Sequence, residues 1–243
     1  MSLHPTTQTI YEFIDIFKEL GFDFYNGPEI ETEWKNFDAL RVAKDHPARD
    51  SQDTFWLPKS FERIEKSGLM ERILPRTQTS NSQIQCMNER IPPIRIISAG
   101  KVFRNEATDA THEAEFHQLE GLCIDKNVSM ADLKNSLTYA FKKFFGDDIQ
   151  VRFRASYFPF VKPGFEVDIL WKDRWLEVCG GGLVHPEVLE NGFKDNEKIS
   201  KDDIQKYSGF AFGMGLERLV MLKYGIDDIR DMSSGDVRFS RWF

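Results

Sequence analysis

The stretch that decides the fold is Ile94-Arg95-Ile96-Ile97, continued by Lys101-Val102-Phe103-Arg104-Asn105-Glu106 and then by Phe116-His117-Gln118-Leu119-Glu120-Gly121-Leu122-Cys123-Ile124. Apolar and polar side chains alternate along these runs, which is typical of half-buried strands. The polar residues 107–115 lie between the two halves. We therefore expect two antiparallel strands joined by a long loop.

Side chains two positions apart on a strand share a face. The side chains that share a face in this way are Arg104 and Glu106 on the first strand, and the polar Gln118 and Glu120 with the aromatic Phe116 on the second. We assign the apolar residues Phe103, Leu119 and Leu122 to the opposite, buried face. The polar surface is either solvated, with ordinary surface ion pairs, or the wall of a cleft. We favour the cleft.

The rest of the chain predicts helices and further strands. A first helix has its apolar face at Ile10, Phe13, Ile14, Phe17 and Leu20, its cap at Thr6 or Thr7 and its end at Gly21. Another helix opens at Ser129 and stops at Gly146. Strands are expected at Val151–Arg154, Glu166–Leu170, Arg174–Cys179 and Gly209–Gly215, the last feeding a helix through Leu222. The predicted fold is α+β, a mostly antiparallel β-sheet flanked by helices, in a single domain of residues 1–243.

Two stretches lack a clear period. Residues 28–58 combine acidic and aromatic side chains, and a long loop of this kind in a compact domain is usually functional or an interface. Residues 191–207 are polar and are interpreted as a surface excursion.

The composition is that of an ordinary globular protein. Of 243 residues, 41% are hydrophobic and 29% are charged, which excludes a disordered, collagen-like or coiled-coil chain. No apolar run approaches the ~18 residues of a membrane span, and the N-terminus lacks the pattern of a secretory signal. With 32 basic and 39 acidic residues the net charge is −7, so bulk electrostatics do not hold nucleic acid.

The cysteines and histidines lack the spacing of zinc or disulfide sites. Cys86, Cys123 and Cys179 form no C-x-x-C, and no H-E-x-x-H occurs. We expect reduced thiols, a cytoplasmic protein and no structural metal.

Two further segments could carry chemistry. The first is Gly209 to Gly215, a glycine-lined strand that is followed by a helix with Arg218 near its start. The dinucleotide motif G-x-G-x-x-G does not fit, because it would need glycine at position 218. The P-loop motif does not fit either, because no G-K-[ST] follows. The planar fork of arginine suits phosphate oxygens, and a surface salt bridge is the alternative. Phe158-Pro159-Phe160, a short extended segment, either walls an apolar slot or supplies two core rings.

These segments together resemble the signature motifs of class II aminoacyl-tRNA synthetases, and in detail the alpha-subunit family of the phenylalanyl-tRNA synthetases. Further matching stretches are Gly27-Pro28-Glu29, Asn36-Phe37-Asp38-Ala39-Leu40, His46-Pro47-Ala48-Arg49, Asp53-Thr54-Phe55-Trp56, Arg76-Thr77-Gln78-Thr79-Ser80, Thr111-His112, His185-Pro186 and Tyr207-Ser208-Gly209. Any one motif is weak, but so many in order from His4 to Phe243 form a specific pattern.

The resemblance implies an enzyme that activates phenylalanine with ATP and transfers it to tRNA(Phe). The catalytic residues would be Arg104 and Arg218, which would hold the α- and γ-phosphates of ATP. Glu106 would contact the adenine, Phe116 would stack on it, and His112 would approach the distal phosphates. The amino acid would contact Gln78, Ser80, Gln83, Gln118, Glu120, Phe158, Phe160, Ala211 and Gly213, with an ionised Glu120 near its ammonium group and Ala211 setting the depth of the slot.

The implied chemistry needs no protein nucleophile, because the amino-acid carboxylate itself attacks the α-phosphorus. Catalysis then rests on positioning and charge stabilisation, with Mg²⁺. Where the family often has a glutamate after Phe-Pro-Phe, this chain has Val161-Lys162-Pro163, so we expect Glu177 to be the metal ligand. The family also carries an N-terminal helical arm that grips tRNA. This chain starts at the catalytic domain, so we expect it to bind tRNA weakly by itself.

The implied partners follow from selectivity. An apolar slot rejects an added hydroxyl by only ~100-fold, so tyrosine calls for a separate editing site, which the family places on the beta subunit. The resemblance therefore implies a heterotetramer of two alpha and two beta subunits, with the stretch after Pro28 as a candidate interface and no membrane contact.

Three alternatives stay open: a class II ligase for another amino acid, a non-catalytic binding or regulatory module, and a fold that is inactive until the beta subunit docks. The presence of both Arg104 and Arg218 argues against the module.

Overall fold

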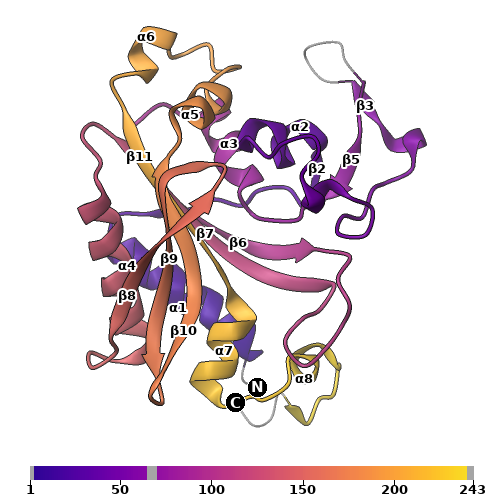
Figure 1. The fold of residues 1–243 in the computed structure, drawn as a ribbon, viewed down its shortest axis with the longest axis vertical. Coiled ribbons are helices and arrows are strands. Elements are labelled where there is room, and N and C mark those ends of the chain that lie inside the picture. Colours follow the sequence, from indigo (N-terminus) through magenta and orange to yellow (C-terminus); the bar gives the residue numbers. More distant parts are fainter. Residues whose placement is uncertain (1–2, 65–69, 240–243) are drawn as a thin grey trace.

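The two decisive strands pair as expected inside a larger sheet. β6 (Ile94–Phe103) and β7 (Glu115–Asp125) are antiparallel neighbours in a seven-stranded sheet of order β1-β6-β7-β11-β10-β9-β8 (Figure 1). The computed structural model describes residues 3–64 and 70–239. The remaining strands of this sheet are β1 (Asp23–Phe24), β8 (Val151–Phe158), β9 (Val161–Trp171), β10 (Arg174–Val184) and β11 (Ser208–Gly215). The pair β1–β6 is parallel and the other pairs are antiparallel, which confirms the predicted fold class.

Helices pack on both faces of this sheet. The helices among the described residues are α1 (Pro5–Glu19), α2 (Glu33–Asn36), α3 (Asn81–Glu89), α4 (Met130–Phe145), α5 (Pro186–Gly192), α6 (Lys201–Ile204), α7 (Leu216–Tyr224) and α8 (Arg230–Ser233), with the 3-10 helices η1 (Asp38–Leu40), η2 (Pro47–Arg49) and η3 (Lys59–Phe61). Two small sheets pair β2 (Ile30–Thr32) with β5 (Ile73–Pro75) and β3 (Arg63–Ile64) with β4 (Met70–Glu71). Among the described residues, no helix is both long and apolar enough to cross a membrane.

The ends of two predicted helices follow local capping chemistry. The Ser129 side chain and Asp132 form a capping box at the start of α4, and Gly146 ends that helix as predicted. For α1 the predicted cap was wrong: Thr6 and Thr7 lie inside the helix, and the His4 ring accepts a hydrogen bond from the Thr6 backbone N–H at 3.3 Å. Pro5 explains the earlier start, because its fixed φ suits the first helical position.

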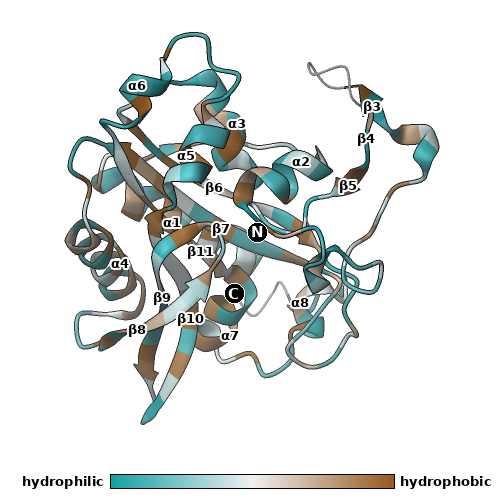
Figure 2. Ribbon diagram, turned by 45° about the horizontal axis from the view of Figure 1, so that its top comes forward, coloured by the Kyte–Doolittle hydropathy of each residue, from teal (hydrophilic) through white to brown (hydrophobic). Residues whose placement is uncertain are grey.

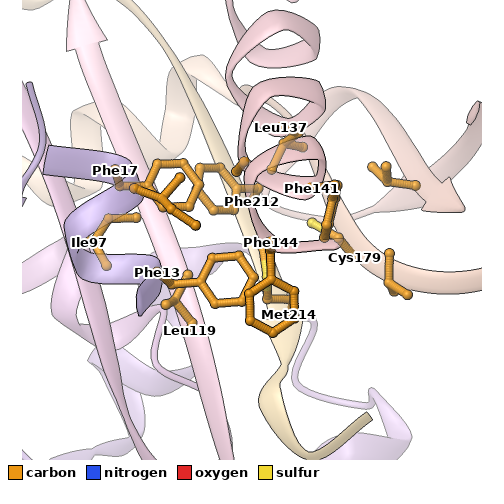
Figure 3. Close-up of a cluster of buried hydrophobic side chains, with 14 of the residues drawn as sticks. Phe13, Phe17, Ile97, Leu119, Leu137, Phe141, Phe144, Cys179, Phe212 and Met214 are labelled. Carbon is orange, nitrogen blue, oxygen red and sulfur yellow. The ribbon is translucent and has the colours of Figure 1, made fainter. Parts of the chain in front are cut away.

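One face of the sheet is covered by α1 and α4. Side chains at alternate positions of the central strands pack there against the two helices (Figure 3). This core includes Phe13, Phe17, Ile97, Leu119, Leu137, Phe141, Phe144, Phe212 and Met214. The ring-rich helices therefore seal this side of the sheet.

The opposite face is covered along only part of its length. Leu122 and Ile124 of β7 and Ala211 of β11 join a second core with residues of α3 and α5. Leu122 thus shares its face with Gln118 and Glu120, and its assignment to the face of Leu119 was wrong, because positions 118, 120 and 122 are two apart. The helical cover reaches as far as Glu120, which Gln83 of α3 contacts at 2.8 Å, and beyond it Gln118 and Phe116 line a cavity.

Two stretches that looked irregular are more ordered than predicted. Residues 28–58 contain β2, α2, η1 and η2, and the buried Arg49 guanidinium pairs with Glu33 at 3.0 Å and Asp38 at 2.8 Å. Residues 191–207 are not merely a surface excursion, because Asn196 is buried and donates to the Met87 carbonyl at 2.7 Å. By contrast, η3, β3 and β4 form an arm that projects from the body, and β3 carries apolar colour at the outer end of this β3–β4 arm (Figure 2).

Candidate active site

Two adjoining cavities lie over the uncovered part of the sheet. The first, of about 290 Å³, is lined by all the residues predicted to bind ATP: Arg104, Glu106, His112, Phe116 and Arg218. The second, of about 380 Å³, is lined by all those predicted to bind the amino acid: Gln78, Ser80, Gln83, Gln118, Glu120, Phe158, Phe160, Ala211 and Gly213. Arg104, Gln118, Glu177, Gly180 and Gly213 line both. The structure therefore brings every predicted site residue into one bipartite site.

Glycines keep the floor of this site at the level of the backbone. Glu120, Gly213 and Gly180 lie opposite one another across β7, β11 and β10. A Cβ on Gly213 would meet the Cγ of Glu120 at 3.0 Å, and one on Gly180 would meet the Phe158 ring at 3.0 Å. Bare backbone at these positions lets a ligand approach the sheet closely.

Two arginines reach the first cavity from different elements. Arg104 follows β6, donates from Nε to the Thr77 carbonyl at 3.0 Å and places its guanidinium 5.0 Å from the centre of the Phe116 ring. Arg218 lies in the first turn of α7 and donates to the Glu177 carbonyl at 3.0 Å. A guanidinium has several N–H donors, so one backbone contact can orient each side chain while others remain for an anion.

The loop between β6 and β7 presents His112 to the first cavity. The Asp109 carboxylate accepts the backbone N–H groups of Thr111 at 2.7 Å and His112 at 2.9 Å, and lies 3.0 Å from the His112 ring. These hydrogen bonds, that of the Thr111 N–H foremost, hold the pKa of Asp109 far below its ordinary value. The Ile229 N–H, just before α8, donates to the Ala110 carbonyl at 3.0 Å. The loop tip is therefore a built turn braced from the C-terminal side.

Glu120 is a buried carboxylate at the centre of the second cavity. It is 5% exposed and accepts hydrogen bonds from Ser80 Oγ at 2.9 Å and Gln83 Nε2 at 2.8 Å. Burial raises its pKa, although the bonds from Ser80 and Gln83 oppose the shift. An ammonium group beside this carboxylate would offset the lost hydration, so the cavity suits a cationic amine.

Phe158 and Phe160 form one wall of the second cavity. They flank the turn between β8 and β9, so the segment is a hairpin turn and not the extended segment that was predicted. Their ring centroids are 5.9 Å apart and the rings are inclined by 19°. With Ala211 on the sheet, they define a slot for a flat apolar group.

Glu177 lies at the junction of the two cavities. Burial, and then the neighbouring charge of Glu166, raises its pKa, with Arg154 and Arg218 opposing. Arg154 lies 2.7 Å from the Glu166 carboxylate and 3.8 Å from that of Glu177, and Glu177 is the carboxylate that also lines both cavities, where a divalent cation could keep phosphates as its other ligands. Among the described residues no group of three or more His, Cys, Asp or Glu side chains could hold a metal by itself.

Sequence reasoning missed Glu217, next to Arg218. Its carboxylate accepts the His117 backbone N–H at 2.9 Å and lies 2.7 Å from the His117 ring, which ties α7 to β7 beside Phe116. The only signal in the sequence is that His117 and Glu217 stand next to Phe116 and Arg218, two predicted site residues. The pairing itself spans 100 residues and carries no local pattern.

The mostly antiparallel sheet, its glycine floor and the two arginines that line one cavity are features of the catalytic core of a class II aminoacyl-tRNA synthetase. A pyrrolysyl-tRNA synthetase from Desulfitobacterium hafniense shares the fold with a TM-score of 0.66 at 19% identity, over 94% of this chain and 72% of that one.

The family model for the tRNA synthetases class II core domain (F) matches residues 1–243, and the chain belongs to this family. It is 47% identical to the phenylalanine–tRNA ligase alpha subunit of Dehalococcoides mccartyi, over 99% of this chain and 69% of that relative. It is 49% identical to the alpha subunit of Erwinia tasmaniensis, over 99% of this chain and 68% of that relative. The resemblance inferred from the motifs is thereby confirmed.

Proposed function

We propose that this chain is the catalytic alpha subunit of a phenylalanine–tRNA ligase. It activates phenylalanine with ATP to phenylalanyl-adenylate and passes the phenylalanyl group to tRNA(Phe). The observation that carries the proposal is a cavity facing two arginines that adjoins a slot walled by two aromatic rings.

Phenylalanine binds in the second cavity. Its ammonium group pairs with Glu120, which Ser80 and Gln83 hold in place, with Gln78 and Gln118 nearby and Gly213 beneath it. Its ring packs against Phe158 and Phe160 above Ala211, because aromatic pairs favour offset or edge contacts. This orientation turns the carboxylate toward Arg104 and the first cavity.

ATP binds in the first cavity. Arg104 holds the α-phosphate, Arg218 the γ-phosphate, and His112 faces the distal phosphates, while Phe116 and Glu106 contact the adenine. A carboxylate oxygen of phenylalanine attacks the α-phosphorus, a new O–P bond forms, and the bond to the bridging oxygen breaks to release pyrophosphate. The protein contributes position and charge stabilisation, with no covalent step. Glu177 would hold Mg²⁺, which when bound neutralises charge on the phosphates.

The partners are a beta subunit, in an assembly of two alpha and two beta subunits, and tRNA(Phe). Phe61, Ile64 and Met70 on the β3–β4 arm are 58%, 73% and 64% exposed, so we assign the beta-subunit contact to this arm. In the acidic stretch that precedes the arm, Glu33 and Asp38 already form ion pairs with Arg49 of the same chain, so their charges are partly neutralised. A third hollow of about 540 Å³, lined by Tyr157, His46 and Phe158, adjoins both substrates and would admit the tRNA end. Buried thiols at all three cysteines suit the reducing cytoplasm, where we place the protein.

The proposal is tested by amino-acid-dependent exchange of pyrophosphate into ATP, with the chain alone and with its beta subunit. Phenylalanine should support exchange, and tyrosine should be less efficient by ~100-fold, because an apolar slot excludes a hydroxyl weakly. Faster exchange with a different amino acid would identify another ligase. No exchange under either condition would identify a non-catalytic module.

Replacing either phosphate-facing arginine should nearly abolish adenylate formation. Arg104→Ala and Arg218→Ala each remove a preorganised charge from the transferred phosphates, which lowers kcat/KM for exchange by ~10²- to 10³-fold. Arg174→Ala, at the exposed start of β10, is the matched control and leaves exchange unchanged. Near-normal exchange by either site variant would refute the assigned roles.

Glu120 should give phenylalanine binding a dependence on pH. Burial raises the pKa of this carboxyl, so the ionised form is lost as the pH falls through a value above that of an ordinary glutamate. KM for phenylalanine should rise over the same interval. In Glu120→Gln it should lie ~10- to 100-fold above the wild-type value where Glu120 is ionised, since a charged hydrogen bond is removed, and it should not change over this pH interval. A wild-type KM that stays flat from about pH 5 to 8 would count against an ammonium contact at Glu120.

Glu177→Ala should increase the Mg²⁺ concentration that gives half-maximal exchange by ~10-fold, because a carboxylate near the metal is lost. Glu190→Ala, an exposed site on α5, serves as the control. An unaltered Mg²⁺ dependence in Glu177→Ala would show that the ligand lies elsewhere.

A further inference from the structure

The aromatic wall of the amino-acid slot stands on a hairpin turn that is tied to a distant segment. We propose that Arg41 is the positioning residue that fixes the Phe158–Pro159–Phe160 turn and thereby tunes affinity and selectivity for the side chain of the amino acid. The inference rests on the proposed function and adds a residue that no motif marked.

The geometry of Arg41 is that of a clamp. At the C-terminal end of η1, its backbone is left-handed, with φ 62° and ψ 22°. Its guanidinium donates to the Pro159 carbonyl at 2.7 Å and, through Nε, to the Glu187 carboxylate at 2.6 Å. One side chain therefore joins η1, the turn and the first helical turn of α5.

The contact with the Pro159 carbonyl falls between the two slot rings. Proline has no N–H, so its carbonyl is the backbone hydrogen-bonding group available there. The far side of the turn is held by a second tie, from the His185 N–H to the Phe160 carbonyl at 3.0 Å. Arg41 fixes the near side, beside Phe158, whose ring occupies the space that a side chain at Gly180 would need. Movement of Pro159 would change the gap between the rings and Ala211.

The carbonyl contact matters more than the ion pair. The Glu187 side chain is 57% exposed, and ion pairs at exposed sites contribute little. Arg41 lines neither of the two substrate cavities, so it acts only through the turn. Its loss should affect the amino acid and leave ATP binding alone.

The test compares Arg41→Asn with the wild-type chain in the enzyme assembled with its beta subunit. Asparagine tolerates the left-handed backbone, so the variant removes the guanidinium without straining η1. KM for phenylalanine should rise by ~5-fold, as for one lost hydrogen bond, with kcat and KM for ATP unchanged. Discrimination against para-substituted phenylalanines should fall. Glu187→Gln, which keeps the carbonyl contact, is the control and should change KM for phenylalanine by less.

The outcomes separate the two claims. Absence of phenylalanine-dependent exchange in the wild type refutes the proposed function. If the wild type is active and Arg41→Asn has the same KM and selectivity, the role of Arg41 is refuted while the function stands. An equal rise of KM for phenylalanine and ATP, or a lowered melting temperature with unchanged selectivity, would make Arg41 a general structural residue and would also overturn the inference.

Discussion

The site depends on a sheet that is sealed on one face and left partly bare on the other. Alternate residues of β7 and β11 enforce this division, because Leu119 and Phe212 face α1 and α4 while Glu120 and Gly213 face the cavities. Apolar burial on the sealed face supplies the stability that the polar face does not. The bare face can then carry glycines, which weaken a strand but let substrates lie on the backbone.

Burying the Glu120 carboxylate has a cost in desolvation free energy, and this cost bears on which ligands the cavity can bind. A buried carboxylate is unfavourable unless it is hydrogen-bonded or paired, and Ser80 and Gln83 satisfy it only in part. Its raised pKa expresses the remaining cost of holding the charge. A ligand with an ammonium group relieves that cost, whereas a neutral analogue leaves it in place. In the proposed function, desolvation of Glu120 accounts for the selection of an α-amino acid, and the aromatic slot discriminates only among side chains.

The features that could be predicted from the sequence are those set by residues close together in the chain. Alternation within 94–124 was enough to predict the hairpin, and Ser129 was enough to predict the start of α4, since both signals are local. The side of Leu122 followed from its spacing to Glu120, but its apolar character suggested the other face. Only the packing of α3 and α5, distant in sequence, explains why it is buried there. The motif resemblance supplied the site residues, and the distances among them came from the fold.

The interactions that place the chemistry are the least local ones. The pairs Arg41–Pro159 and His117–Glu217 are 118 and 100 residues apart in the chain, and the contact from Ile229 to Ala110 has a similar span. Each joins a turn, loop or helix start that carries cavity-lining groups to an element far away in the chain. A reaction without a protein nucleophile gains its rate from the relative positions of substrates, so small displacements of these groups are costly. The alternation of residues along the strands thus forms the floor of the cavities, and a few long-range hydrogen bonds fix the side chains that wall them. Substitutions at these hydrogen bonds are therefore expected to change substrate selectivity more than overall stability.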